Sequence, residues 1–317
     1  MDSKFLQIHH QTIKISDSKF HFLKPKTLPE SRISFSSLSL KCSLSSTNPP
    51  TTKEEAILQV KTSLSSTLEK PLNNPRLAGK IKKVKQPRLR VEIPVIDDSP
   101  ASLTQLALEV FGEMPIRRKG SKIKILIIWP TQSLTQAAAV AFESQSSNLL
   151  TENVLISSVL EEDPRVLNSA DVVVFLSPES SQLSIMKTVT DSIYPKPVII
   201  FNPKWGFEEE SDFGELSGFV CTFEVVYSFM GLEVKGILSK RKGVIFKCVK
   251  DGILSGEKWN VLVEEEEELK VVSTFKARPS IIEVENVLYN LMAINSPITK
   301  SAKFLKELLS NVTGRKK

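Results

Sequence analysis

The sequence lacks histidine beyond residue 21. Its three histidines, His9, His10 and His21, all lie in an amino-terminal segment with the composition of a cleavable leader. Without that segment, imidazole is not available as a general base, as the partner of a nucleophilic serine or cysteine, or as a zinc or non-haem iron ligand. The composition of the working chain therefore argues against a large group of hydrolases and metalloenzymes.

Glycine, cysteine and long apolar runs are also scarce. The 12 glycines form neither GxGxxG nor GxxxxGK[ST], so neither a dinucleotide loop nor a P-loop is indicated. Beyond the leader only Cys221 and Cys248 remain, in apolar runs without CxxC spacing. We expect two small buried hydrophobic residues, with a redox pair as the alternative. The longest apolar run, near 123–130, is far shorter than a membrane span of ~18 residues, so the sequence predicts no cofactor, no metal and no transmembrane helix.

Residues 1–42 are basic, rich in serine and poor in acidic residues. They hold seven lysines or arginines against three acidic residues, and serines crowd positions 31–46. This composition is typical of an organelle transit peptide, since the continuous apolar core of a secretory signal is missing. The step Leu40-Lys41-Cys42-Ser43 and the single arginine favour a plastid over a mitochondrion. We predict a plastid transit peptide over 1–42 and a disordered stretch over 43–52; an ordinary disordered tail is the alternative.

The positive charge of the chain belongs mostly to this leader. The whole sequence carries 42 basic and 36 acidic side chains, a net charge of +6. Because the leader supplies seven of the basic and three of the acidic residues, the remainder is close to neutral. The basic balance is therefore no sign of a nucleic-acid partner, and none is predicted.

An amphipathic helix and a basic connector come next. Apolar residues recur at helical spacing over 53–70, after a capping threonine and before Pro71. Residues 71–87 form an exposed connector, and seven basic side chains between Arg76 and Arg90 occur without one acidic residue. No aromatic residue is interleaved, so stacking on single-stranded RNA is not indicated. The candidate contacts with an anionic lipid surface or an acidic partner are Lys80, Lys82, Lys83 and Lys85.

From residue 88 the pattern alternates between short apolar strands and amphipathic helices. Strands that are apolar on both faces and separated by helices indicate a mainly parallel sheet covered on both sides. The fold class is therefore α/β with a parallel three-layer core. The predicted strands lie near 89–93, 123–129, 154–159, 171–176 and 198–201, and the helices near 99–114, 134–142 and 180–193.

After Asn202 the spacing of the β-like segments shortens, which suits antiparallel neighbours. Turns are expected at Lys242-Gly243 and at 250–252, and the acidic run Glu264–Glu268 is most simply a solvated turn. We predict a single domain over 88–312, with an antiparallel β-meander from about 219, C-terminal helices and a tail at 313–317. The β-like segments lie near 219–229, 232–238, 244–249, 259–263 and 270–276, and the helices near 284–292 and 304–312.

Ligands of open α/β sheets bind beyond the carboxyl ends of the parallel strands, so the loops at these ends are the candidate site. Each loop places polar groups next to a helix start or a turn, where backbone N–H groups can receive an anion. In this hypothesis hydroxyl and amide groups donate to a phosphate or carboxylate, and an aspartate holds a cation or hydroxyl. The candidate ligand-binding residues are Asp97, Asp98, Thr131, Gln132, Ser133, Glu179, Asn202 and Trp205. No catalytic residue is assigned.

A structural interpretation of the same loops needs fewer assumptions. Ser99, Thr131 and either Ser177 or Ser180 are residue types that cap helices in any protein. The adjacent carboxylates of Asp97 and Asp98 usually point apart at a helix entry, where one of them interacts with the helix dipole. We therefore favour capping over ligand binding.

Several short motifs occur in an order that resembles a known family. They are Arg88-Leu89-Arg90-Val91-Glu92-Ile93-Pro94, Asp97-Asp98-Ser99, Phe201-Asn202-Pro203, Tyr227, Trp259-Asn260-Val261-Leu262 and Pro279 at a helix start. Over about 53–309 the chain resembles a plastid and cyanobacterial domain family of unknown biochemical function. Its members include the low-photosystem-II-accumulation type of assembly protein and the carboxyl-terminal extension of a chloroplast adenylate kinase. The resemblance implies a protein of the chloroplast stroma or the stromal face of the thylakoid, and it transfers no catalytic residue.

Leader, fold and resemblance together favour a non-enzymatic auxiliary or assembly factor of the chloroplast, for photosystem II or another thylakoid complex, that acts by protein binding. The expected partners are chloroplast proteins, including thylakoid complex subunits, with peripheral contact to the membrane. The alternative is a nucleotide- or metabolite-binding enzyme that uses the crevice at the strand ends. An RNA-associated protein is a third hypothesis, and it rests on the basic connector alone.

Overall fold

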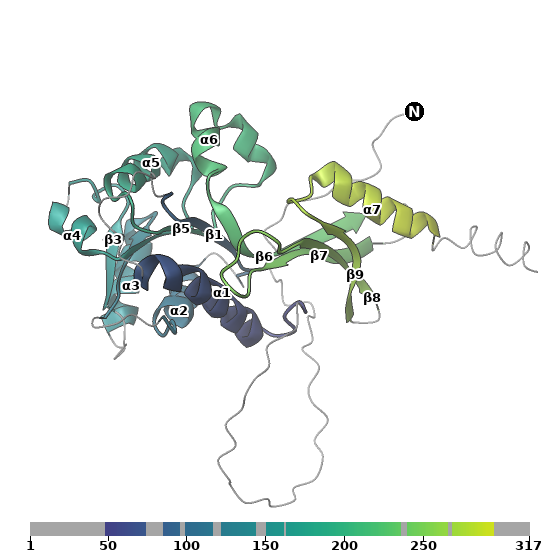
Figure 1. Cartoon of the computed structure of the whole chain (residues 1–317), viewed down its shortest axis with the longest axis horizontal. Helices are drawn as coiled ribbons and strands as arrows, with labels where there is room; N and C mark the ends of the chain where they lie inside the picture. The colour runs from purple at the N-terminus through teal and green to yellow at the C-terminus, as the bar shows by residue number, and fades with distance from the viewer. Residues whose placement is uncertain are drawn as a thin grey trace, which may run out of the picture.

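The computed structural model describes residues 48–73, 85–95, 99–116, 122–143, 150–161, 163–235, 240–265 and 268–294. One nine-stranded mixed sheet carries helices on both faces (Figure 1), which confirms the α/β class and the antiparallel extension. The strands are β1 Arg88–Glu92, β2 Lys124–Trp129, β3 Leu150–Leu155, β4 Val172–Leu176, β5 Val198–Phe201, β6 Glu224–Lys235, β7 Lys240–Cys248, β8 Trp259–Glu265 and β9 Glu268–Phe275. The helices are α1 Lys53–Asn73, α2 Pro100–Phe111, α3 Gln132–Glu143, α4 Pro164–Ser169, α5 Leu183–Ser192, α6 Ser217–Val220 and α7 Ile281–Ile294, with short 3-10 turns η1 Ser180–Gln182, η2 Glu208–Asp212 and η3 Gly214–Leu216. Within these ranges, no helix has both the length and the hydropathy to cross a membrane.

Six neighbouring strands, in the order β3-β2-β4-β5-β1-β6, are parallel. β4 and β5 are buried along their whole length because helices cover both faces. At the sheet edge, β3 is more polar, and its side chains bond to β2: Glu152 lies 2.6 Å from the Lys124 ammonium, and Asn153 accepts from the Trp129 indole at 2.8 Å. This edge position explains why the strand lies at 150–155 and not at the more apolar 154–159.

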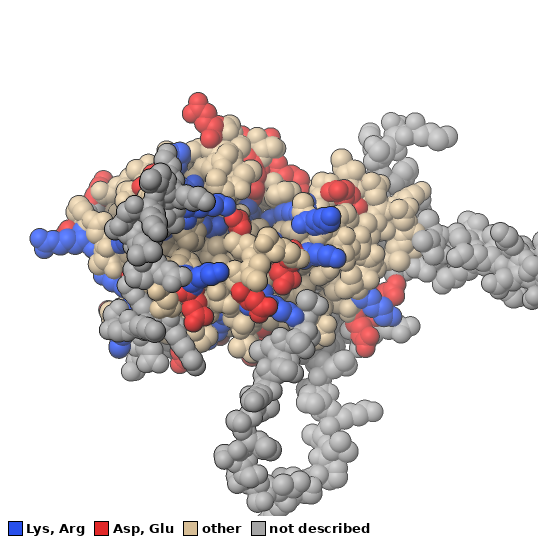
Figure 2. Space-filling view, viewed as in Figure 1, with Lys and Arg blue, Asp and Glu red and all other residues tan. Residues whose placement is uncertain are grey.

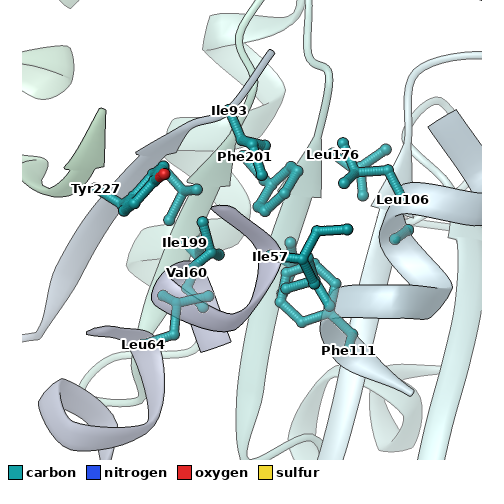
Figure 3. Close-up of a cluster of buried hydrophobic side chains, with 14 of the residues drawn as sticks. Ile57, Val60, Leu64, Ile93, Leu106, Phe111, Leu176, Ile199, Phe201 and Tyr227 are labelled. Atoms are coloured by element: carbon teal, nitrogen blue, oxygen red, sulfur yellow. The ribbon is translucent and has the colours of Figure 1, made fainter. Parts of the chain in front are cut away.

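Two hydrophobic layers hold the helices onto the parallel sheet. One contains α1, α2 and α3; Figure 3 shows its centre, where Ile57 and Val60 of α1 lie near Phe111 of α2 and Phe201 of β5. The other contains α4, α5 and α6, with Met186 of α5 fully buried. Burying one such side chain contributes about 1.5–3 kcal/mol, so these layers fix the three-layer arrangement.

The crossovers change direction at two places in the sheet. Connections through α2 and α3 run on one face toward β3, whereas those through α4, α5 and α6 run on the other face back toward β6. Apart from the edge strand β3, neighbouring strands therefore send their following helices to opposite faces at β2/β4 and again at β1/β5. These are the two switch points, the places where ligands bind in open α/β sheets.

β6 joins the parallel core to the antiparallel extension. It is parallel to β1 and antiparallel to β7, and β8 and β9 continue the meander. α7 covers one face of the extension through Val284 and Leu288. α1 packs beside β6 and β7 on the other face, where Tyr227 and Phe246 share its hydrophobic cluster. The amino-terminal helix is therefore part of the domain core.

The antiparallel part differs from its prediction at the start and in one turn. A short helix, α6, and one long strand, β6, replace the two strands predicted at 219–229 and 232–238. The predicted turn at Lys242-Gly243 lies inside β7. Gly243 is needed there for close packing, since a Cβ would come within 2.4 Å of the Leu262 carbonyl oxygen of β8.

Two further differences concern helices. α1 was expected to end before Pro71 but continues to Asn73. Pro71 removes one backbone hydrogen bond and crowds the carbonyl four residues before it, and only two residues of the helix follow it. The helix predicted near 304–312 lies outside the described residues, as do 1–47 and most of the basic connector.

Gly252 fixes the contact between the β7–β8 turn and α1. Its φ is +65°, and a Cβ there would lie 2.4 Å from the Ser66 carbonyl oxygen. Gly214 has a φ of +57°, but a Cβ there would meet nothing within 4 Å.

We expect Gly214→Ala to lower the free energy of unfolding by about 1–2 kcal/mol through left-handed strain. Gly252→Ala should lower it further because α1 must move to make room for the Cβ. Urea unfolding measures both losses, and equal losses would contradict this contact.

Candidate functional site

Thr131, at the β2/β4 switch point, caps α3. Its hydroxyl oxygen accepts from the Leu134 N–H at 3.4 Å and lies 3.2 Å from Ser133 Oγ. Gln132 and Ser133 follow in the first turn and are exposed. The polar residues that suggested an anion site thus lie at the helix start, where capping also requires them.

Gln182 closes the same switch point from the β4 side. Its side-chain amide donates to the Pro130 carbonyl oxygen at 3.0 Å, and its Oε1 accepts from the Glu179 N–H at 3.0 Å. The Glu179 side chain lies 3.7 Å from Lys204 Nζ. Protein groups therefore tie the loops after β2 and β4 together where a ligand would bind.

Asn202 bridges the β1/β5 switch point. Its Oδ1 accepts from the Ile93 N–H and its Nδ2 donates to the Ile93 carbonyl, both at 2.8 Å. Its φ is +48°, a conformation that asparagine tolerates better than most residues. The side chain predicted to donate to a ligand therefore bonds to the backbone that follows β1.

The remaining candidates divide between the core, the surface and the residues outside the structure. Trp205 is buried; its indole N–H donates to Glu210 at 3.3 Å, and its ring meets Phe213 edge-on. Lys85 is exposed and pairs with Glu224 at 2.6 Å. Outside the described residues lie Asp97, Asp98, Lys80, Lys82 and Lys83.

A group of buried charges at the carboxyl end of β1 was not predicted. It consists of Arg90 and Glu92 of β1, Glu210 of η2 and Arg278 before α7, and we call it the buried charge cluster; each side chain is less than a tenth exposed. Arg90 lies 2.8 Å from Glu92 and makes a close ion pair with Glu210. Arg278 lies 3.0 Å from Glu92. Two positive and two negative charges neutralise one another, which an interior of low polarity requires.

The pKa of Glu92 is about 2, below its ordinary value of 4.5. Burial would raise this pKa, but Arg278, Arg90 and a hydrogen bond donated by Ser228 at 2.7 Å outweigh it. Burial alone would lower the pKa of Arg90, but the carboxylates of Glu92 and Glu210 outweigh this effect and raise the pKa. A general acid or base works best with a pKa near the working pH. Glu92 is therefore suited to holding structure and not to carrying protons near neutral pH.

Arg278 extends the buried charge cluster to the antiparallel extension. Its guanidinium lies 4.3 Å from the centre of the Phe207 ring and 5.3 Å from that of Trp259, and it contacts Met230 Sδ at 3.1 Å. Each such cation–π contact contributes about 0.5–2 kcal/mol. The segment before α7 thus joins β1, β6, β8 and the β5–β6 connection.

Two of the four residues in the buried charge cluster can be recognised from the sequence. Arg90 and Glu92 are charged residues two apart in a predicted strand, so they share one face of a sheet expected to be covered on both sides. Their partners Glu210 and Arg278 come from irregular segments 120 and 186 residues away. No local pattern marks those two residues.

Cys221 and Cys248 are free thiols and differ in environment. Cys248 is half-buried with its Sγ 3.4 Å from Ser63 Oγ, and burial raises its pKa. Cys221 is exposed, so the expectation of two buried residues is wrong for it; it follows the short helix α6 and does not lie in a strand. In the part of the chain that is described, no three histidine, cysteine or acidic side chains are placed to hold a metal ion.

Asn202→Gly should destabilise the protein without any ligand. Glycine accepts the φ of +48° but loses both hydrogen bonds to Ile93, at about 0.5–1.5 kcal/mol each. Asn202→Ala should lose more because of left-handed strain, whereas Gln132→Ala, exposed on the same edge, should change stability by less than about 0.5 kcal/mol. Thermal and urea unfolding measure these differences. Unchanged stability in Asn202→Gly would reopen the ligand hypothesis.

Glu92 should make stability depend on pH in the acid range. Its folded pKa is lowered, so its ionisation stabilises the fold above about pH 4.5, and this contribution is lost as the pH falls toward 2. The difference between the two pKa values corresponds to roughly 3 kcal/mol. Urea unfolding at a series of pH values should show the gap between wild type and Glu92→Gln shrinking over this range. A gap that stays constant would refute the assignment.

One family model matches the chain. It is described as Domain of unknown function (DUF1995) and covers residues 50–286, which include both switch points and the whole buried charge cluster. No curated protein and no solved structure matches. Because the family model spans most of the sequence, the chain belongs to the DUF1995 family.

Proposed function

We propose that this protein is a non-catalytic auxiliary or assembly factor of the chloroplast that acts by binding other proteins, for photosystem II or another thylakoid complex. The observation that favours binding over catalysis is the closure of both switch points by internal hydrogen bonds, from Gln182 to Pro130 and from Asn202 to Ile93. In an enzyme of this architecture the polar groups at these places contact the substrate. Here they bond to the protein itself.

The distribution of charge supports a protein partner over a nucleic acid. On the face shown in Figure 2, basic and acidic side chains are interspersed, and acidic ones gather over η2, η3 and α6. The exposed acidic residues of that segment are Glu208, Glu209, Asp212 and Glu215. A nucleic-acid surface would instead gather basic side chains on one face.

The chloroplast part of the proposal has a separate basis. It rests on the basic, serine-rich composition of residues 1–42 and on the order of short motifs in the folded part. It can therefore fail while the proposal of a binding function survives.

Import of the full-length chain into isolated chloroplasts tests location and membrane contact together. We expect a product shortened by about 40–50 residues that sediments partly with thylakoids and is released by high salt, because exposed charge contacts are screened beyond about 8 Å. Reversing Lys80, Lys82 and Lys83 to glutamate should reduce the thylakoid fraction without lowering the melting temperature; Lys85 is left unchanged because it pairs with Glu224. The control makes the same charge change elsewhere, at the exposed residues Lys122, Arg165 and Lys258.

Three outcomes would contradict the proposal. An unprocessed chain outside the organelle, or thylakoid binding that resists both salt and carbonate, would overturn the location or the peripheral contact. A saturable thermal stabilisation of the purified protein by a nucleotide, a sugar phosphate or a tetrapyrrole would favour the enzyme hypothesis over the binding function.

A further inference from the structure

α7 covers an apolar face of the antiparallel extension that has a small core of its own. The face consists of Ile245 of β7 with Trp259, Val261 and Val263 of β8, each at most 5% exposed. This cluster is separate from the two layers around the parallel core. In Figure 1, α7 lies across this end of the sheet, away from α2 to α5. The helix can therefore leave without opening either of the larger cores.

Few buried side chains hold α7 in place. Val284 and Leu288 are buried, Val287 and Leu291 pack against the face while partly exposed, and Tyr289 is 60% exposed on the outer side. The inward positions recur three, four and seven residues apart, the spacing of a single amphipathic stripe. The face is thus shaped to receive one apolar stripe of a helix.

Arg278 ties the start of α7 to the central sheet, and Glu92 keeps other partners when Arg278 withdraws. Glu92 keeps Arg90 at 2.8 Å and the Ser228 hydroxyl at 2.7 Å when Arg278 leaves. The guanidinium itself becomes hydrated. Arg90 then faces both Glu92 and Glu210, so withdrawal leaves one net negative charge in the interior. This cost holds α7 in place until a partner competes for the face.

We propose that α7 is a displaceable cover, pinned by Arg278, and that the face beneath it binds an amphipathic helix of a partner protein. The face already accepts a helix with apolar side chains at the spacing of Val284, Leu288 and Leu291. Lys247 stands 5.3 Å from the centre of the Trp259 ring, so an acidic residue on the partner helix is favoured beside it. The inference rests on the proposed binding function and names the place and chemistry of the partner.

Hydrogen exchange of the full chain tests whether α7 opens on its own. In the wild type, amides of α7 should exchange before those of β1, β4 and β5, because the cover opens without global unfolding. Arg278→Gln should speed the exchange of α7 by roughly tenfold or more and leave the parallel strands unchanged, whereas the nearby exposed control Lys276→Gln should match the wild type. Exchange of α7 only together with the parallel strands would refute the cover, and this wild-type result holds even if Arg278→Gln folds poorly.

A labelled peptide with the sequence of residues 279–294 tests the helix-binding face. It should bind Arg278→Gln more tightly than wild type, by about the factor seen in exchange, because the open state is more populated. The same peptide with Leu288→Asp should not bind. Equal binding of the two peptides, or no binding to a variant whose α7 exchanges fast, would refute the proposed face. Both measurements use purified protein, so their results do not depend on chloroplast import or thylakoid association. If they refute the face beneath α7, the proposed binding function can still use another part of the surface.

Discussion

The ionised carboxylate of Glu92 in the protein interior is the constraint on which much of the remaining structure depends. A buried charge needs close partners, and within the described strands Arg90 and Ser228 supply two of them. The other partners come from two irregular segments, which fold so that Glu210 reaches Arg90 and Arg278 reaches Glu92. Since apolar replacements of buried ion pairs can be equally stable, we attribute to these charges the positioning of the β5–β6 connection and of the segment before α7.

The fold has the architecture of a ligand-binding α/β protein, yet its own side chains bridge both switch points. One amide at each place, Gln182 and Asn202, links the loop after one strand to the loop after its neighbour. Such bridges make the strand ends rigid, so they brace the domain. The proposed binding face lies instead on the antiparallel extension, which continues the same sheet outward through β6.

The parallel core could be predicted from the sequence because strands buried on both faces consist of continuous runs of apolar residues. The cap at Thr131 was also predictable, since capping depends on residues three apart. The bond between Asn202 and Ile93 was not, because it joins residues 109 positions apart and uses a side chain equally suited to a ligand. Gly243 misled for a related reason: glycine marks turns and close backbone contacts alike, and only the neighbouring strand distinguishes them.

The packing of α1 has a consequence for how the chain is made. Ser63 of this helix touches Cys248 of β7, 185 residues later. During synthesis from the amino terminus, the apolar stripe of α1 therefore emerges long before the strands that will shelter it. The final arrangement must wait until most of the polypeptide has left the ribosome, and contacts of such high sequence separation form slowly. The nascent chain therefore leaves part of the apolar stripe of α1 exposed until β6 and β7 have been made.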